Sequence, residues 1–342
     1  MSRVDWAPLV DRISRARRIV LTTHINADGD GLGCEIALRE AIAAKGRGVV
    51  VINNESVPAR FRFLRGSETV EAFRPDAHAP VLADADLVIV IDNSSVERLA
   101  RLRPAIESSR AVRACIDHHS LINPYWTLNC VDVEACASGE LVHELIRRLD
   151  VAVTPSMAAA LYVSIISDTG YFRFAKTTAA SHRLAAGLIE IGGLSPAAIH
   201  TELYERLSLA ISLLTGLAMR SLALETGGRV AWMKLLREDV VACGGEAEDT
   251  GDLANLALAI DGVSIGLLFR EMGGGETKVS LRSKGSLDVH AVAADLGGGG
   301  HRNAAGVLMN APLDRVIQIV LGRVAEILPG AVTVPIRGGR AG

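Results

Sequence analysis

Aspartate and histidine follow apolar runs in four separate segments of this sequence. These residues are His24, Asp28, Asp30, Asp92, Asp117, His118, His119 and Asp168. Carboxylates crowded together repel one another unless some are protonated or cations lie among them. Mixed nitrogen and oxygen ligands suit Mn²⁺ and neighbouring hard cations, and two such ions about 3.5–4 Å apart support in-line displacement at phosphorus. If the four segments meet, their side chains predict a centre for two divalent metal ions.

The stretch 23–33, THINADGDGLG, also has the glycines of a dinucleotide-binding loop. The G-x-G-x-x-G fingerprint would need a glycine at position 34, where this sequence has Cys34. Such a loop presents backbone N–H groups to phosphate, and two aspartates beside it would repel the phosphate. We therefore interpret this stretch as metal-binding.

Several of these aspartates and histidines also have an ordinary structural explanation. The alternatives are a helix cap for Asp30, a capping turn for Asp92, a polar loop for His118 and His119, and a turn for Asp168. These alternatives stay open for each residue alone. The combination of four segments is what favours metal binding.

Short β-branched runs alternate with helical stretches through the first half of the chain. Strands are predicted at 17–24, 48–53, 85–93 and 112–119, and helices at 32–46, 138–150, 155–167 and 178–192. This alternation predicts an α/β fold with a doubly wound, mostly parallel sheet. Because sites in such folds form outside the carboxyl ends of the strands, the acidic residues and histidines are expected at one edge.

The pattern changes in the second half, after a stretch rich in Gly, Ser and Pro near 192–204. A connecting helix is predicted at 205–222, antiparallel strands at 227–235, 262–272 and 277–285, and helices near 250–261 and 288–296. We predict a catalytic domain at 1–192, a linker and connecting helix at 193–222, a smaller α/β domain with a mixed or antiparallel sheet at 223–336, and a disordered tail at 337–342.

Composition excludes several classes of function. Aromatic residues make up 4% and the net charge is −3, so neither rows of stacked bases nor a broad basic surface for long nucleic acid is expected. The five cysteines form no C-x-x-C pair, which argues against a disulfide framework or a zinc site. No apolar run approaches ~20 residues and no signal peptide is evident. We expect a cytoplasmic protein that does not bind membranes.

Taken together, the motifs resemble those of the DHH phosphoesterase superfamily. HINADGDGLG, VIVIDNS, IDHHS and SDTGYFRF are similar to its four motifs, in order. Farther on, LRSKG and GGGGHRNAAG (297–306) resemble the DHH-associated C-terminal domain. Two positions depart from the usual first motif, with Ala27 in place of proline and Cys34 in place of serine. Neither is a ligand position, so the departures concern loop stiffness more than chemistry.

The resemblance implies a role for each residue of the centre. One divalent ion, expected to be Mn²⁺, would be held by His24, Asp28, Asp92 and Asp168, and a second by Asp30, Asp92, His118 and Asp168. The catalytic residues would be His119, Asp92 and Asp168: His119 contacts the phosphate under attack, and the two aspartates bridge the metals, between which a water becomes the nucleophile. Asp117 would orient its neighbours through hydrogen bonds.

The second domain would bind the substrate. Alternation in TKVSLRSKG puts Lys278, Ser280, Arg282 and Lys284 on one face of a strand, which is alternatively a solvated face. GGGG at 297–300, alternatively a flexible turn, is expected to open a small-residue helix and to let the backbone approach a phosphate. The resemblance implies the substrate-binding residues Arg282, Ser283, Lys284, Gly299, Gly300 and His301.

Within the superfamily, the compact two-domain layout is most similar to the nanoRNase type. The resemblance implies hydrolysis of short oligoribonucleotides to nucleoside 5′-monophosphates, and of 3′-phosphoadenosine 5′-phosphate to AMP. Alternatives are a soluble phosphodiesterase for cyclic or linear dinucleotides (the cyclic di-AMP type), a RecJ-like single-strand exonuclease, and a catalytically silent nucleotide-binding module. The expected partners are therefore short oligoribonucleotides or small phosphorylated nucleotides, and a homodimer stays open.

Overall fold

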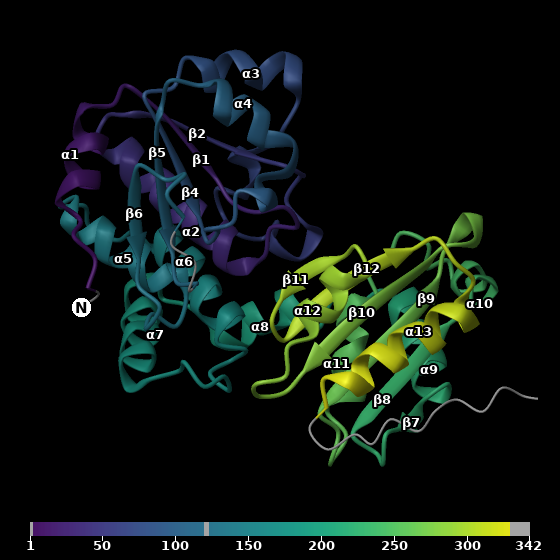
Figure 1. Ribbon diagram of the computed structural model, residues 1–342. Helices are drawn as coiled ribbons and strands as arrows, with labels where there is room; N and C mark the ends of the chain where they lie inside the picture. The colour runs from purple at the N-terminus through teal and green to yellow at the C-terminus, as the bar shows by residue number, and fades with distance from the viewer. Residues whose placement is uncertain (1–2, 120–122, 329–342) are drawn as a thin grey trace, which may run out of the picture. The chain divides into compact units, whose positions relative to one another are not determined.

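The computed structural model describes residues 3–119 and 123–328, the side chain of His301 excepted (Figure 1). The predicted tail at 337–342 lies outside the described residues. The chain divides into two compact units, Met1–Arg206 and Leu207–Gly342, and each is described by itself. None of the described helices has the length and the apolar composition needed to cross a bilayer.

The N-terminal unit is built on a parallel sheet of six strands in the order β3-β2-β1-β4-β5-β6. The strands are β1 (Arg18–Thr22), β2 (Gly48–Asn53), β3 (Val70–Ala72), β4 (Leu87–Ile91), β5 (Val112–Asp117) and β6 (Leu128–Val131). The order reverses between β1 and β4, which pair in register with Ile19 opposite Leu87. This arrangement confirms the predicted doubly wound α/β sheet.

Helices cover both faces of this sheet, so its central strands are mostly apolar (Figure 1). Helices α1 (Ala7–Arg15), α2 (Gly29–Ala44), α5 (Ser138–Arg148), α6 (Pro155–Asp168), α7 (Ala179–Gly192) and α8 (Pro196–Tyr204) cover one face, and α3 (Pro75–Ala83) and α4 (Arg103–Ser108) the other. In β4, Leu87 and Ile89 enter the first core while Val88 and Val90 enter the second. The strand is therefore buried along its whole length.

The glycines of the stretch 29–33 serve the packing of helix α2. A Cβ atom at Gly33 would overlap the carbonyl oxygen of Ala160 on α6, and one at Gly31 would overlap the hydroxyl of Thr23. Glycine at these positions lets α2 lie close to α6 and to the end of β1. The glycines thus have a packing role that needs no bound dinucleotide.

The C-terminal unit contains a mixed sheet in the order β11-β12-β10-β9-β8-β7. The strands are β7 (Ala223–Glu225), β8 (Val230–Leu235), β9 (Ile265–Glu271), β10 (Thr277–Ser283), β11 (Gly299–His301) and β12 (Ala304–Met309). The sheet is mixed rather than wholly antiparallel, which is one of the two predicted arrangements, because its strands β8 and β9 are parallel. The chain between them passes through α10 (Arg237–Ala242) and α11 (Ala254–Leu258), and such a crossover returns it to the starting end of the sheet.

The helix that we predicted after the four glycines is wrong. Residues 299–301 and 304–309 form an antiparallel hairpin in which Gly299 pairs with Gly306 and Gly300 with Ala305. Gly300 has a φ of +139°, which glycine adopts without strain. The small residues that suggested a helix instead allow the two strands to pair closely.

Two layers of helices cover the mixed sheet (Figure 1). Helices α9 (Leu209–Arg220), α10 and α11 pack on one face, and α12 (Val289–Asp295) and α13 (Leu313–Glu326) on the other. The predicted linker at 193–222 contains two helices, of which α8 packs into the core of the N-terminal unit and α9 into that of the C-terminal unit. The chain therefore passes from one unit to the other between these two helices.

Candidate metal centre

Three neighbouring strands and two helices bring the predicted ligands to a common edge of the parallel sheet. His24 follows β1, Asp92 follows β4, and Asp117 ends β5 directly before His118. Asp28 and Asp30 lie at the start of α2, and Asp168 is the last residue of α6. The strand order reverses at this edge, where doubly wound folds place their sites.

Among the described residues, three groups of potential ligands lie at this edge, each with its ligand atoms within 4.8 Å of one another, and one of them, Asp92, Asp117, His118 and His119, overlaps the other two. The first of these two consists of His24, Asp28 and Asp92. Nε2 of His24 is 3.4 Å from Oδ2 of Asp92 and 3.7 Å from Oδ2 of Asp28. Nδ1 of His24 lies 2.7 Å from the carbonyl oxygen of Ile25, to which it can donate its proton. With Nδ1 donating there, Nε2 is the ring nitrogen that could offer a lone pair to a cation bound among the carboxylates.

The second group consists of Asp30, His118 and Asp168. Nε2 of His118 is 3.1 Å from Oδ2 of Asp168 and 3.8 Å from Oδ2 of Asp30, and Nδ1 is 3.2 Å from the carbonyl oxygen of Ala135. Nε2 is buried and makes no hydrogen bond with a described residue. A buried imidazole nitrogen that faces carboxylates without a hydrogen-bond partner fits the donor set of a metal site.

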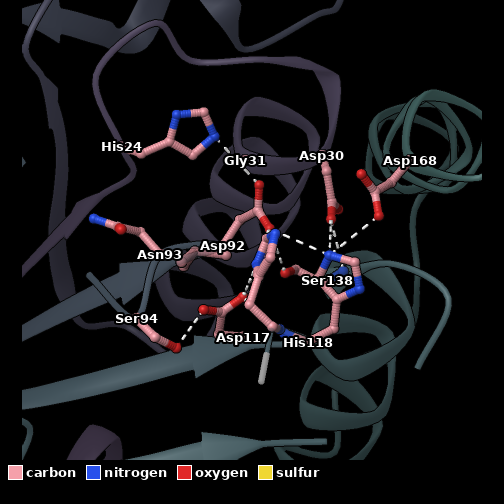
Figure 2. A network of polar contacts seen from close by, with 12 residues as sticks. His24, Asp30, Gly31, Asp92, Asn93, Ser94, Asp117, His118, Ser138 and Asp168 are labelled. Carbon is pink, nitrogen blue, oxygen red and sulfur yellow. Dashed lines mark hydrogen bonds and ion pairs between the residues drawn. The ribbon is translucent and has the colours of Figure 1, made fainter. Parts of the chain in front are cut away.

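Asp92 lies between the two groups. Figure 2 shows its carboxylate with His24 on one side and Asp30, His118 and Asp168 on the other. Its Oδ2 faces His24, whereas its Oδ1 is 3.6 Å from Nε2 of His118. The hydroxyl of Ser138 donates to Oδ1 over 3.1 Å. One carboxylate is thus in reach of both groups.

Burial and mutual repulsion perturb the acids of this centre. Burial raises the pKa of Asp30 far above its usual value, and the negative charges of Asp92 and Asp168 add to the rise. Burial also raises the pKa of Asp168, to about 6. Burial opposes protonation of His24, but Asp28 and Asp92 outweigh it and raise its pKa to about 10. Cations bound among these groups would remove the repulsion.

Asp30 accepts hydrogen bonds from backbone and hydroxyl groups that do not belong to the predicted motifs. The N–H groups of Ser138 and Gly139, at the start of α5, donate to its carboxylate over 2.7 and 3.1 Å, and the hydroxyl of Ser164 donates over 2.5 Å. Our sequence analysis missed Ser138 and Ser164. The only signal was a serine at a helix start in CASGE, which is common without function. The cap of α2 is Asp28, which accepts from the N–H groups of Asp30 and Gly31.

Asp117 contacts the neighbouring histidines rather than the solvent. Its Oδ1 accepts from the N–H groups of His118 and His119, over 2.7 and 3.2 Å, and lies 2.6 Å from Nδ1 of His119. The hydroxyl of Ser94 donates to its other oxygen. Burial alone would raise the pKa of Asp117, but His119 and these hydrogen bonds lower it. Asp117 is therefore an anion that fixes the ring of His119. One of its carboxylate oxygens also lies within 4.8 Å of a ligand atom of Asp92, so it belongs to a further group of potential ligands.

The candidate substrate-binding residues lie around β10 to β12 of the C-terminal unit. Lys278 and Arg282 share a face, where Arg282 pairs with Asp252 over 3.2 Å and Lys278 with Asp249 over 3.4 Å. Ser280, on the same face, is 6% exposed. These side chains are therefore not the freely solvated row that the alternation suggested.

Other candidates differ in how accessible they are. Ser283 is buried, and its hydroxyl donates to the carbonyl oxygen of Leu287 over 2.8 Å. Lys284 follows β10 and is exposed, whereas Gly299 and Gly300 lie in β11. The side chain of His301 lies outside the described residues. Asn303, which we did not predict, donates to Ser283 and so connects LRSKG with the glycine-rich hairpin.

Both units match known protein families. Residues 18–165 match the N-terminal domain of the DHH family, and residues 238–330 match the DHHA1 domain. Among similar solved structures, an exopolyphosphatase-related protein from Bacteroides fragilis has a TM-score of 0.90 at 21% identity and covers 95% of this chain and 98% of its own. RecJ of Thermus thermophilus, solved in complex with Mn²⁺, has a TM-score of 0.51 at 17% identity and covers 93% and 53%. At these identities the likeness concerns the fold alone.

Relatives of known name are similar along almost the whole chain. The bifunctional oligoribonuclease and PAP phosphatase NrnA of Thermus thermophilus is 32% identical over 324 residues, which are 92% of this chain and 91% of that protein. The protein of the same name from Bacillus subtilis is 27% identical and covers 87% of this chain and 91% of its own length. The resemblance that we inferred from the motifs is confirmed, and this chain belongs to the DHH family of phosphoesterases, which are hydrolases.

Proposed function

We propose that this protein is a two-metal phosphoesterase that hydrolyses short oligoribonucleotides to nucleoside 5′-monophosphates, and 3′-phosphoadenosine 5′-phosphate to AMP. The observation that carries the proposal is the pair of ligand groups on either side of Asp92. The names of the similar proteins from Thermus thermophilus and Bacillus subtilis support this choice of substrates.

The donor set of the centre fits divalent cations such as Mn²⁺. One would be held by His24, Asp28, Asp92 and Asp168, and the other by Asp30, Asp92, His118 and Asp168. When bound, such ions lower the pKa of a bound water and neutralise charge on the reacting phosphate. In this scheme the chain positions the ligands: Ser138 holds Asp92, and α5 holds Asp30 through backbone N–H groups.

His119 is the proposed contact to the phosphate under attack. Its Nδ1 is held by Asp117, and the proposed contact to a phosphate oxygen is made through Nε2. The side chain of His119 is 35% exposed while that of Asp117 is fully buried, so the histidine is the accessible member of the pair. Asp117 keeps the ring in one orientation and stabilises its protonated form.

In the C-terminal unit, we assign substrate binding to Arg282, Ser283, Lys284, Gly299, Gly300 and His301. A phosphate would compete with Asp252 for the guanidinium of Arg282, which can bind two oxygens at once. Recognition through phosphates agrees with the low aromatic content, which leaves few rings for stacking on bases.

Hydrolysis of a substrate panel with and without Mn²⁺ tests the proposal. The panel contains a ribodinucleotide, a five-residue oligoribonucleotide, 3′-phosphoadenosine 5′-phosphate, cyclic di-AMP, pyrophosphate and a long single-stranded DNA. We expect turnover of the first three, loss of turnover in EDTA, and recovery with Mn²⁺. Exclusive turnover of cyclic di-AMP or of the long DNA, or no turnover despite bound Mn²⁺, would contradict it.

A further inference from the structure

Arg98 lies next to the metal centre in a position that its backbone fixes. It belongs to the 3₁₀ turn Glu97–Leu102, which follows β4 and Asp92. Its carbonyl oxygen accepts a hydrogen bond of 2.9 Å from the N–H group of Ile25, the residue after His24. The residue is half-buried. The turn is thus attached to the segment that carries the first ligand group.

The guanidinium of Arg98 has carboxylates near it but no partner among the residues that the structure describes. Burial lowers the pKa of Arg98, and the negative charges of Asp92, Asp28 and Asp117 partly oppose this effect. None of them forms an ion pair or a hydrogen bond with Arg98, although a guanidinium has five N–H donors. The donors of a half-buried arginine are normally paired. A bound ligand would therefore be the expected partner for those of Arg98.

Two neighbouring cationic side chains, unlike that of Arg98, donate hydrogen bonds to the protein backbone. Arg101, on the same turn, donates to the carbonyl oxygens of Asn54 and Phe73 over 2.7 and 3.1 Å. Lys176 donates to the carbonyl oxygen of His118 over 3.1 Å. Both hold the backbone around the site. Among residues 3–119 and 123–328, no such contact involves the side chain of Arg98.

We propose that Arg98 binds the non-bridging oxygens of the substrate phosphate at the metal centre, which makes it a catalytic residue of the proposed hydrolysis. The inference rests on the proposed function. The carboxylates near Arg98 are those assigned to cations or to His119, so they do not need its charge. A planar guanidinium suits two phosphate oxygens, and its attraction grows as charge builds up on them in the transition state.

The backbone after Arg98 supports this assignment. Ala100 has a φ of +45° and a ψ of −117°, a conformation that is costly for alanine. Strained residues of this kind gather where a site must hold a side chain in one place. The kink separates Arg98 from Arg101, so that the two side chains have different environments on one short turn.

Three variants test the role of Arg98 in the full-length protein with Mn²⁺. R98A should lower kcat for a ribodinucleotide by about 100-fold or more, the usual effect of losing a group that stabilises developing charge. R98K keeps the charge but not the fork, so it should recover only part of this loss. R103A is the matched control, because the half-buried Arg103 pairs with Glu107 over 2.8 Å instead of facing the centre; it should behave as wild type.

The affinity for the product AMP is a second measurement of the role of Arg98, and it does not depend on turnover. By calorimetry with Mn²⁺, R98A and R98K should bind AMP at least about tenfold more weakly than wild type, with the same manganese content. Wild-type kcat and AMP affinity in R98A would overturn the inference, and so would full recovery by R98K, which would show a role in charge balance alone. A wild type that binds AMP through Arg98 but hydrolyses nothing would overturn the proposed function and leave this inference standing.

Discussion

Asp92 adopts a backbone conformation that few aspartates share, with a φ of +58°. Its N–H group donates to the carbonyl oxygen of Ile116 on the neighbouring strand over 2.8 Å, which holds the chain in this turn. As a result, one carboxylate oxygen faces His24 and the other faces His118. A single side chain thereby connects two ligand groups, which is the geometry that a bridging ligand requires.

Asp92→Asn should abolish activity without unfolding the protein. Asparagine keeps the shape and tolerates a positive φ, but a neutral amide cannot bridge two cations, so we expect kcat with Mn²⁺ to fall by at least about 100-fold. The bound manganese should fall as well, and the circular dichroism spectrum should stay native. Asp150→Asn is the matched control, since Asp150 also has a positive φ, +53°, but is exposed outside the centre. Wild-type activity in Asp92→Asn would contradict the bridging role.

Glu35 is a second acid of unusual environment, buried in α2 below the centre. Its Oε2 accepts from Nδ2 of Asn53 over 2.7 Å, whereas Oε1 has no described partner. Burial raises its pKa from 4.5 to about 8, although the hydrogen bond from Asn53 opposes the rise. The folded protein therefore keeps a proton that the unfolded chain releases. The stability that this group contributes is complete below pH 4.5 and is lost as the pH rises through about 8.

Glu35→Gln should remove this part of the pH dependence, because glutamine does not titrate. Relative to wild type, the variant should gain unfolding free energy between pH 5 and pH 8.5, as measured by urea unfolding in EDTA. Glu40→Gln, on the same helix, is the control and should keep the wild-type slope. If the two variants show equal slopes, Glu35 does not hold the proton.

At the scale of elements, the centre depends on how closely α2 lies against α6. Helix α2 carries Asp30 and is capped by Asp28, and the last residue of α6 is Asp168. Gly33 permits the contact, because a side chain there would overlap the carbonyl oxygen of Ala160. The distance between two of the candidate ligands, Asp30 and Asp168, is thus set by the packing that Gly33 permits.

Gly33→Ala should destabilise the protein, although alanine is the better helix former. The added methyl has no room, so we expect a loss of about 1–3 kcal/mol in unfolding free energy and weaker Mn²⁺ binding as Asp30 moves away from Asp168. Gly187→Ala is the matched control. Gly187 lies in α7 with open space where a Cβ would be, so it should gain roughly 0.5–1 kcal/mol. Urea unfolding and manganese titration measure both effects, and a stabilised Gly33→Ala would refute the packing argument.

At the scale of the whole molecule, the two units have different parts in the proposed reaction. All the candidate metal ligands lie in the N-terminal unit, whereas the paired cations and the glycine-rich hairpin lie in the C-terminal unit. Metal should therefore stabilise one unit more than the other, because a ligand stabilises the structure that binds it.

Hydrogen exchange of the full-length protein with Mn²⁺ or with EDTA can measure this difference. We expect slower exchange with Mn²⁺ in the segments that hold the ligands, 24–31, 92–94, 117–119 and 164–168. Residues 223–328 should show little change, and Asp92→Asn should lose the protection. Protection confined to the C-terminal unit would place the metal elsewhere.

The sequence by itself determined the class of fold and predicted the acidic residues and histidines that meet at one edge of the sheet. An apolar strand followed at once by Asp or His is a local pattern, and parallel strands that alternate with helices must end at one edge. The four segments around His24, Asp92, His118 and Asp168 could therefore be assigned to one centre before any coordinates. The family followed from the same residues.

Only the tertiary structure decided which strands are neighbours and which other groups join them. The pairing of β8 with β9, the hairpin after Gly297 and the approach of Ser138 to Asp92 are contacts between distant segments, and local periodicity does not encode them. Likewise, only the structure shows that no other described residue pairs with the guanidinium of Arg98. Propensity acts on neighbours along the chain, whereas the register of a sheet and the environment of a charge are set by packing across it.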